Sequence, residues 1–280
     1  MKVMRISAFS LNNAGGNPAG VVIGDSMPSE PDMQAIAKDV GYSETAFLEP
    51  CGDEWRIRYF APEQEVPFCG HATIAAATAL GKRFGPGQYD LILNNASITV
   101  EAVCLSDGHW KGVLTSPSTT SAPAQETLLT SSLETFNFDR SDLDPRFPPA
   151  VGSAGANHLL LALKSHETLS SMTYDYQHLR KVMLDNELTT VNLFYSQEQN
   201  VFHSRNPFAA GGVYEDPATG AAAAALSGYL RDIGWMTSGR ISIFQGREMD
   251  APSKITADIG EASGSGIRIS GETRLISASE

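Results

Sequence analysis

Two stretches of the chain decide its fold, EVPFCGHATIAAATALGKRF at residues 65–84 and EDPATGAAAAALSGYLRD at residues 215–232. Their first eight residues coincide at Glu, Pro, Gly and Ala, with an offset of 150 residues. Each motif runs into an Ala-rich segment of high helix propensity, which predicts helices over His71–Phe84 and Ala221–Ile233. The repeat of motif and helix together indicates a duplicated lobe with two symmetric helix starts.

Between these helices, short apolar segments typical of strands alternate with helical patterns, which predicts a mixed α/β protein. Residues 116–125, SPSTTSAPAQ, lack apolar periodicity and are rich in Ser, Thr and Pro, so they are predicted to be a linker. The expected lobes are therefore 1–115 and 126–268. Further strands are expected at Met4–Phe9, Ala19–Ile23, Thr45–Leu48, Trp55–Phe60, Leu91–Leu93, Ile98–Val103, Lys111–Thr115, His158–Leu163, Thr190–Tyr195, Ile241–Gln245, Lys254–Ala257 and Ile267–Ser270, and further helices at Pro31–Val40 and Tyr176–Asn186.

The composition excludes several classes of function. Lys plus Arg number 20 against 32 Asp plus Glu, a net charge of −12 that repels phosphate backbones and anionic membranes. Three cysteines, Cys51, Cys69 and Cys104, are too few and too scattered for a disulfide framework or a zinc site. The first residues carry no signal-peptide pattern, and no apolar run approaches the roughly 18 residues of a membrane span. A soluble, cytoplasmic protein that binds neither nucleic acid nor membrane is expected.

Both repeated motifs place a glycine, Gly70 or Gly220, at the entrance of a helix. The first N–H groups of a helix have no partner within the helix, and its dipole favours an anion there. Two such ends could hold a small carboxylate. Alternatively, the glycines only permit close packing of a buried Ala-rich helix. The chain has no Walker, dinucleotide-binding, HExxH, CxxC or GxSxG motif, so neither a cofactor nor a metal is expected.

Five segments, two of which contain the repeated motifs, resemble one known family. They are GNPAGVV at 16–22, MQAIAKDVGYSETAF at 33–47, RYFAPEQEVPFCGHATIAAATAL at 58–80, EDPATGAAAAALSGYL at 215–230 and ISIFQGREM at 241–249. The sequence is similar to the PhzF-like phenazine biosynthesis proteins, which have the diaminopimelate epimerase-like fold. The resemblance implies two pseudo-symmetric lobes, each a curled sheet around a central helix, with the site in the cleft between them. It also implies that roughly the last 12 residues return to the first lobe, and that the protein is a homodimer.

The resemblance also assigns roles to individual residues. Glu44, in Ser43-Glu44-Thr45, matches the family's proton-shuttling acid/base, although a loop Glu is by itself usually solvated. His71 matches an active-site His, and Asp216 matches an active-site Asp that would equally suit a helix cap. The expected catalytic residues are therefore Glu44, His71 and Asp216. The expected substrate-binding residues are Gly70, His71, Thr219, Gly220 and Ala221.

The chain departs from the family pattern at two positions. Ala221 replaces a frequent Ser, and Ala251 replaces a frequent Arg before Pro-Ser, which argues against transferring the phenazine-pathway substrate. Racemases of this fold use one thiol from each lobe. Cys69 occupies the first position, but residues 217–220 contain no Cys, so a two-thiol racemase is not expected. Cys69 itself is interpreted as a small packed residue.

The resulting hypothesis is a cofactor-independent isomerase that transfers a proton on a small carboxylate-bearing metabolite. A lyase, dehydratase or epimerase on a similar substrate would use the same proton abstraction. A protein that binds a metabolite or a partner without turnover also remains open, because fold does not fix function.

Overall fold

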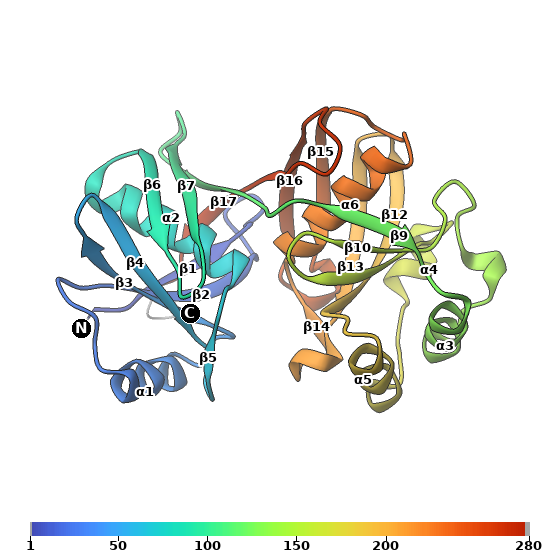
Figure 1. The fold of residues 1–280 in the computed structure, drawn as a ribbon, viewed down its shortest axis with the longest axis horizontal. Helices are drawn as coiled ribbons and strands as arrows, with labels where there is room; N and C mark the ends of the chain where they lie inside the picture. Colours follow the sequence, from blue (N-terminus) through green and yellow to red (C-terminus); the bar gives the residue numbers. More distant parts are fainter. Residues whose placement is uncertain (1, 278–280) are drawn as a thin grey trace. The chain divides into compact units, whose positions relative to one another are not determined.

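The computed structural model describes residues 2–277, which divide into two compact units (Figure 1). The described residues up to Thr115, together with those from Ser270 onward, form unit 1. Ser116–Ile269 form unit 2. The lobes expected from the sequence were 1–115, with the last residues of the chain, and 126–268.

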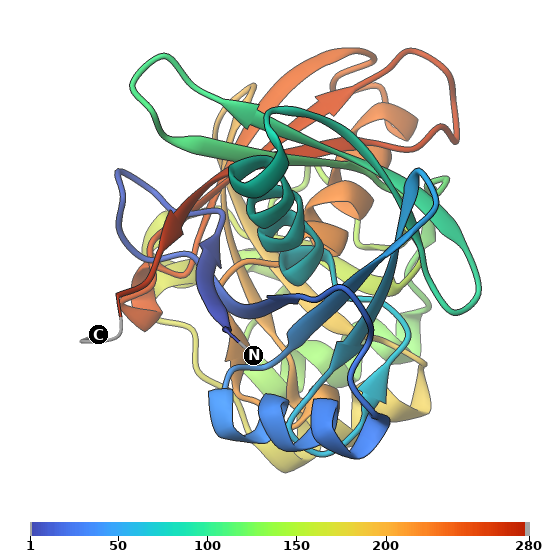
Figure 2. The same ribbon diagram turned by 90° about the vertical axis from the view of Figure 1, so that its left-hand side faces the viewer.

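Unit 1 is a closed ring of strands around one helix (Figure 2). Around the ring, β1 pairs with β2, β2 with β3, β3 with β4, β4 with β6, β6 with β7, β7 with β8, β8 with β17 and β17 with β1. Pairs β2–β3 and β4–β6 are parallel. The strands are β1 (Met4–Ala8), β2 (Asn17–Ile23), β3 (Thr45–Cys51), β4 (Glu54–Phe60), β5 (Glu65–Val66), β6 (Gly87–Ile92), β7 (Ser97–Cys104), β8 (Trp110–Thr115) and β17 (Arg268–Leu275).

The helix inside this ring is α2 (Gly70–Phe84), whose residues from His71 to Gly81 are all buried. Its many alanines allow the strands to approach the helix on every side, because their side chains end at Cβ. A Cβ at Gly81 would lie 2.5 Å from the Cβ of Ala102 and would overlap the Trp110 ring, so only glycine fits there. The Ala-rich pattern therefore reflects burial all round the helix rather than an amphipathic surface helix.

A second helix, α1 (Glu30–Val40), lies outside the ring of unit 1. It begins at Ser29, whose hydroxyl accepts a hydrogen bond from the N–H of Asp32, and it ends at Gly41 in the left-handed conformation. Met33 and Ala37 pack with buried side chains of β2, β3 and β4 in a small core. Helix α1 therefore covers the outer face of the sheet at β3, the strand that follows Glu44.

Unit 2 repeats the same order of pairings. β9–β10, β10–β11, β12–β13, β13–β14 and β15–β16 are antiparallel, and β11–β12 and β13–β15 are parallel. Its elements are β9 (Thr120–Pro123), α3 (Glu126–Phe136), β10 (Ala150–Ser153), β11 (Asn157–Ala162), α4 (His166–Ser170), α5 (Tyr176–Asp185), β12 (Thr190–Glu198), β13 (Val201–Pro207), β14 (Glu215–Asp216), α6 (Gly220–Asp232), β15 (Gly239–Gln245) and β16 (Ser253–Ile259). Single 3₁₀ turns lie at Arg140–Asp142, Ala209–Gly211 and Arg247–Met249.

The two units share one order of strand pairings. In unit 1 the run β1 to β7 contains antiparallel, parallel, antiparallel, parallel and antiparallel pairs, and β10 to β16 repeats that run. In both, a two-residue strand that begins with the repeated Glu leads into the central helix, α2 or α6. The predicted fold class, two lobes of one topology with a sheet around a central helix, is confirmed.

The two sides of the unit 2 sheet carry different helices. α6 packs against β9, β10, β11 and β16, and it is buried from Ala222 to Arg231. The opposite layer is a leucine-rich core to which α3, α4 and α5 contribute. Successive side chains of β11 point to opposite faces of the sheet. Leu159 and Leu161 therefore belong to the leucine-rich core, whereas Leu160 does not.

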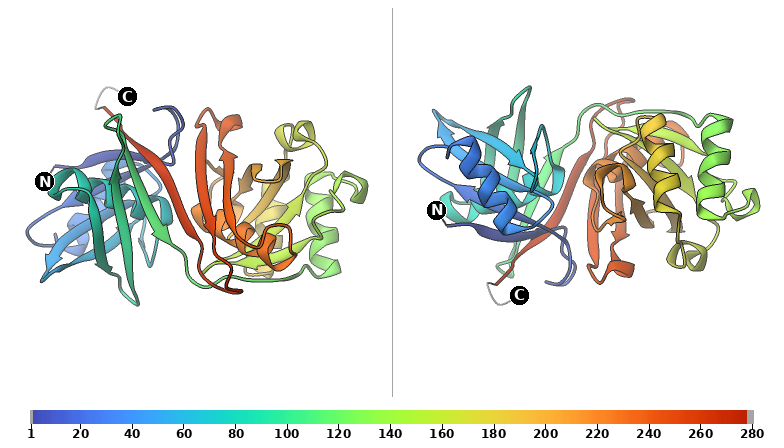
Figure 3. Two further views of the ribbon diagram at one scale, coloured as in Figure 1. Left: turned by 90° about the horizontal axis from the view of Figure 1, so that it is seen from above. Right: turned by 90° about the horizontal axis from the view of Figure 1, so that it is seen from below.

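Part of the segment predicted to be a linker, residues 116–125, forms a strand. Within it, Thr120–Pro123 form β9, which pairs with β10 over four residues. The segment is mostly exposed and therefore lacks the apolar pattern of a strand, and its backbone partners come from residues 150–153. At the other end of the chain, Figure 3 shows β17, in dark red, among the strands of unit 1. In the described part of the chain, no helix is long and apolar enough to cross a membrane.

Candidate active site

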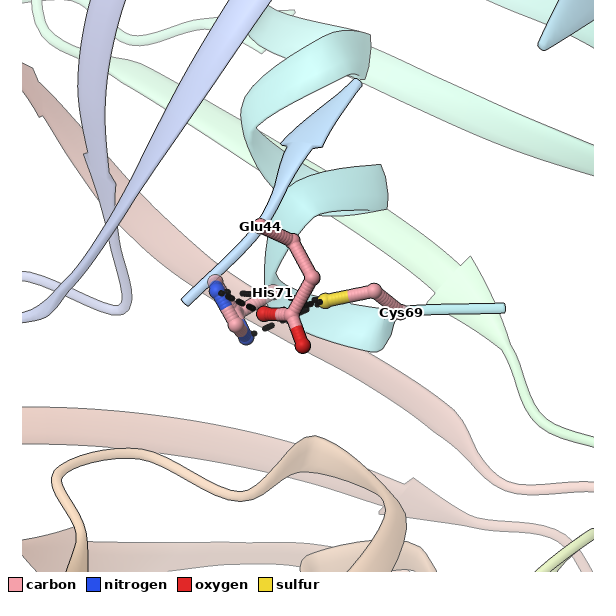
Figure 4. A group of neighbouring side chains, drawn as sticks. All are labelled: Glu44, Cys69 and His71. Carbon is pink, nitrogen blue, oxygen red and sulfur yellow. Dashed lines mark hydrogen bonds and ion pairs between the residues drawn. The ribbon is translucent and has the colours of Figure 1, made fainter. Parts of the chain in front are cut away.

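Three side chains that differ in chemistry meet at the start of α2 (Figure 4). The Oε2 atom of Glu44 lies 3.3 Å from Nε2 of His71 and 3.4 Å from Sγ of Cys69. The same Sγ lies 3.3 Å from Nδ1 of His71. A carboxylate, a thiol and an imidazole, each able to hold or release a proton, are therefore within direct hydrogen-bonding reach of one another.

Backbone hydrogen bonding fixes Glu44 at the start of β3. It is the residue before that strand, and its carbonyl accepts a hydrogen bond from the N–H of Gly20 at 3.2 Å. The following residues, Thr45 to Leu48, are buried, which fixes the direction in which Glu44 leaves the sheet. Its own side chain remains 19% exposed. The carboxylate is thus anchored on a rigid strand and still reaches solvent.

Cys69 and His71 are placed by the N-terminus of α2. Cys69 is the N-cap residue, and its carbonyl accepts hydrogen bonds from the N–H and the hydroxyl of Thr73. The α2 N-terminus has neither a side-chain cap nor an acidic residue in its first turn. Nε2 of His71, which contacts Glu44, also lies 3.3 Å from Oγ of Ser43. The first N–H groups of α2 and its dipole therefore favour an anion next to the Glu44 cluster.

Packing does not explain the glycine at position 70. A Cβ built there would meet no atom closer than Cε1 of Phe68, at 4.0 Å. This differs from Gly81 in the same helix, where a Cβ would overlap its neighbours. The packing interpretation of the first repeated glycine is therefore wrong. The absence of a side chain leaves the backbone at the helix entrance open to a ligand.

The second helix start, in unit 2, has a different polar network. Asp216 ends β14, and its Oδ2 accepts a hydrogen bond from the hydroxyl of Thr219 at 2.6 Å. Gln245 donates from Nε2 to the carbonyl of Asp216 at 2.6 Å and accepts the N–H of Thr219 at 3.1 Å. Thr219, not Asp216, is the N-cap residue of α6. The structure therefore links Asp216 to Thr219 and leaves Gly220 and Ala221, both half-buried, as the first residues of the helix.

The structure brings together part of the predicted site within each unit. Glu44, His71 and Gly70 form one group in unit 1, and Asp216, Thr219, Gly220 and Ala221 form one in unit 2. Sequence reasoning missed Ser43, Gln245 and the contacts of Cys69. Each of the three lies next to a predicted site residue or within a family segment, which is the signal that could have found it. Ser43 adjoins Glu44, Cys69 adjoins Gly70, and Gln245 lies in the ISIFQGREM segment. Cys69 is buried, whereas Cys51 and Cys104 are exposed.

The comparisons with known proteins agree with this fold. The family model "Phenazine biosynthesis-like protein" (PhzC-PhzF) matches residues 6–278. An uncharacterized isomerase of Bacillus subtilis, YfhB, is 28% identical, over 98% of this chain and 98% of its own. The trans-2,3-dihydro-3-hydroxyanthranilate isomerase of Pseudomonas chlororaphis is 31% identical, over 90% of this chain and 88% of its own. The crystal structure of a Bacillus anthracis phenazine biosynthesis protein of the PhzF family superposes with a TM-score of 0.85, at 22% identity, over 99% and 98% of the two chains.

The fold and the site thus define an α/β protein of two similar lobes, each with a network of polar side chains at the start of its central helix. The chain belongs to the phenazine biosynthesis-like (PhzC-PhzF) family. Curated relatives in this comparison are named isomerases, and the prediction of a PhzF-like isomerase is confirmed at that level.

Proposed function

We propose that this protein isomerises a small carboxylate-bearing metabolite by moving a proton with Glu44. One observation carries the proposal: the Glu44 carboxylate contacts both His71 and Cys69 at the uncapped start of α2. A general base needs a proton acceptor on a rigid support and a partner that tunes or relays the proton. Glu44 on β3 and His71 on α2 meet both requirements.

The substrate carboxylate would lie against the N–H groups at a helix start. In unit 1 these are the groups around Gly70 and His71, where the missing side chain leaves room. Thr219, Gly220 and Ala221 are the proposed counterparts in unit 2. Glu44 would then take the proton from the carbon next to the activating group and return it to another carbon, assisted by His71 and Asp216. The net reaction moves one hydrogen and one double bond and needs no oxidant.

The substrate class follows from the helix starts and agrees with one relative's name. An anthranilate carries a carboxylate, and the Pseudomonas chlororaphis relative is named for isomerising an anthranilate derivative. We do not assign that compound to this chain, because Ala221 and Ala251 depart from the family pattern at two positions. Binding in a cleft between the lobes, a homodimer and a cytoplasmic location stay predictions.

Hydrogen exchange tests the proposal without knowledge of the substrate. A pool of small carboxylic metabolites is incubated in deuterated water with the wild type, with Glu44→Gln, or with Glu63→Gln, a change at an exposed residue of the same unit. Proton NMR should detect deuterium entering one compound with the wild type and with Glu63→Gln. With Glu44→Gln the rate should fall by about 10²–10⁴-fold. Full exchange in that variant would remove Glu44 from the mechanism.

The same assay separates the alternatives. Loss of water or of another group from the labelled compound indicates a lyase or dehydratase, and inversion at the labelled carbon indicates an epimerase. A two-thiol racemase has no support, since residues 116–269 contain no cysteine. A compound that raises the melting temperature without exchanging hydrogen indicates binding without turnover.

A further inference from the structure

We propose that Glu44, Cys69 and His71 together form a binding site for one thiophilic divalent metal ion, with Zn²⁺ as the ion that fits best. Each residue offers one ligand atom, and these atoms all lie within 4.8 Å of one another. The site coincides with the proposed proton-transfer group, but metal binding itself does not depend on the proposed function.

The donor set selects the ion. Zn²⁺ is bound in proteins by Cys sulfur, His nitrogen and carboxylate oxygen, and three protein ligands plus one open position are typical of accessible zinc sites. A thiolate and an imidazole disfavour Mg²⁺ and Ca²⁺, which prefer oxygen ligands throughout. With the Cys69 thiolate and the Glu44 carboxylate both anionic, the two charges of Zn²⁺ are balanced. This balance offsets the repulsion that the positive end of α2 exerts on a cation.

The geometry also fits. Zinc bonds of about 2.3 Å to sulfur and about 2.0–2.2 Å to nitrogen and oxygen, at tetrahedral angles, place ligand atoms roughly 3.3–3.6 Å apart. The measured edges are 3.3 Å from Glu44 Oε2 to His71 Nε2 and 3.4 Å from Oε2 to Cys69 Sγ. The third edge, from Sγ to Nε2, is 3.8 Å. The three atoms therefore already outline one face of a tetrahedron, and a metal ion could enter with shifts of a few tenths of an ångström.

The surroundings hold the ligands in place. Cys69 is the N-cap and His71 the second residue of a buried helix, and Glu44 directly precedes a strand whose first four residues are buried. The Glu44 side chain is 19% exposed, which provides an entry and a fourth position for water. Cys51 and Cys104, by contrast, are exposed. Among the described residues, only Glu44, Cys69 and His71 bring three such groups together.

Metal binding would have a consequence for catalysis, and this consequence rests on the proposed function. A carboxylate bound to Zn²⁺ no longer accepts a proton from substrate, so micromolar zinc would inhibit hydrogen exchange, and a chelator would restore it.

Cobalt absorbance tests the site with the metal alone. Co²⁺ is titrated into the reduced wild type, and thiolate ligation is detected by the sulfur-to-cobalt charge-transfer band in the near ultraviolet. We expect one equivalent, displaced by Zn²⁺ and retained when both exposed cysteines are replaced in Cys51→Ser/Cys104→Ser. Cys69→Ser should abolish the band. Glu44→Gln and His71→Gln should each weaken affinity by at least about 100-fold, since even the loss of an outer partner costs 10–100-fold.

Any of three results of the cobalt titration would overturn the proposal. They are no charge-transfer band in the wild type, a band that persists in Cys69→Ser, and a band that disappears in the Cys51→Ser/Cys104→Ser control. A measurement on the unmodified wild type guards against misfolding of the variants: Zn²⁺ should slow alkylation of Cys69, followed by peptide mass spectrometry, and leave Cys51 and Cys104 unprotected. Equal alkylation with and without Zn²⁺ would also refute the site. Since neither readout involves turnover, failure here is separable from failure of the isomerase assignment.

Discussion

Arg205 binds Glu215 through two parallel hydrogen bonds, from Nε to Oε1 at 3.0 Å and from Nη2 to Oε2 at 2.6 Å. The same two pairs of atoms join Arg58 to Glu65 in unit 1, at 2.8 Å and 2.6 Å. Glu65 and Glu215 are the first residues of the two repeated motifs. In both units, therefore, an arginine on the preceding strand forms a bidentate ion pair with the repeated glutamate. This ion pair holds in place the short strand that leads to the central helix.

The two clamps differ in burial, which predicts unequal costs of removal. The Arg205 and Glu215 side chains are 7% and 3% exposed, against 20% and 22% for Arg58 and Glu65. Arg205→Met leaves the Glu215 charge buried without its partner, so it should lower the free energy of unfolding by about 3–5 kcal/mol. Arg58→Met, the matched change in unit 1, should cost about 1 kcal/mol. Urea denaturation of both variants measures the difference.

A double variant separates a buried charge from lost packing. Arg205→Met/Glu215→Leu removes both charges and should recover much of the stability that Arg205→Met loses, because apolar pairs of similar volume often replace buried ion pairs. If the double variant is no more stable than Arg205→Met, the loss of stability does not come from the unpaired charge of Glu215. The three carbonyl groups of Leu169, Ser170 and Met172, to which Nη1 of Arg205 also donates, are the first place to look.

Alanine at two glycines of α2 should have opposite effects on stability. Gly70→Ala places a methyl group where no atom is closer than 4.0 Å, and it should leave the melting temperature unchanged or raise it. It should nevertheless raise KM, because the methyl group occupies the proposed carboxylate position. Gly81→Ala forces a Cβ against Ala102 and Trp110 and should destabilise by about 1–3 kcal/mol. An unchanged KM in folded Gly70→Ala would contradict carboxylate binding at this helix start.

His158 predicts a loss of stability in mild acid. Burial lowers the pKa of His158 from 6.5 to about 3, and its Nδ1 lies 2.8 Å from the hydroxyl of Thr190. Between these pH values the unfolded chain binds a proton that the folded chain does not. The contribution is therefore fully present above pH 6.5, and stability falls below it by up to about 1.4 kcal/mol per pH unit. The free energy of unfolding at pH 7 and pH 5 measures the slope.

Two variants test whether His158 causes this dependence of the unfolding free energy on pH. His158→Gln should flatten the difference between pH 7 and pH 5, since Gln does not titrate. His109→Gln, at an exposed histidine, should leave it unchanged. If both variants keep the wild-type slope, other groups control the acid sensitivity.

Gln245 predicts coupled effects on stability and binding in unit 2. Its side chain is buried and joins the carbonyl of Asp216 to the N–H and hydroxyl of Thr219. Gln245→Leu removes these three hydrogen bonds and should destabilise by about 1–3 kcal/mol. It should also raise KM by loosening the start of α6. Gln199→Leu, an exposed position, serves as the control, and an equal effect of both would show that Gln245 has no special role.

Much of the fold was predictable where apolar pattern and turn residues agree. The central helices were predicted to within one residue of their observed starts, because Ala-rich segments bounded by glycine have few other solutions. β9 was not predictable from its own residues, since its partner strand begins 27 residues after β9 ends. α3 was also missed. Its buried side chains include Leu128, Leu129 and Leu133, but serines and threonines between them obscure the pattern.

The candidate site was predictable as single residues but not as a cluster. Glu44 and His71 came from motifs, whereas the position of Cys69 between them depends on strand β3 meeting helix α2 across 25 residues of sequence. The sequence interpretation of Cys69 as a small packed residue is right about burial and incomplete about contacts. Side-chain neighbours of this kind arise from tertiary packing, which local pattern does not encode.

The ring of unit 1 closes only through β17, whose Ala8–Thr273 and Ile6–Leu275 pairings join the first and last parts of the chain. The Thr273 hydroxyl also lies 2.9 Å from that of Thr78 on α2 and donates to the carbonyl of Trp110. During synthesis, residues 2–115 therefore cannot complete their sheet until unit 2 has been synthesised and β17 is available to pair. A nascent chain that lacks its last dozen residues has an open edge between β1 and β8, where chaperones or a second nascent chain would pair.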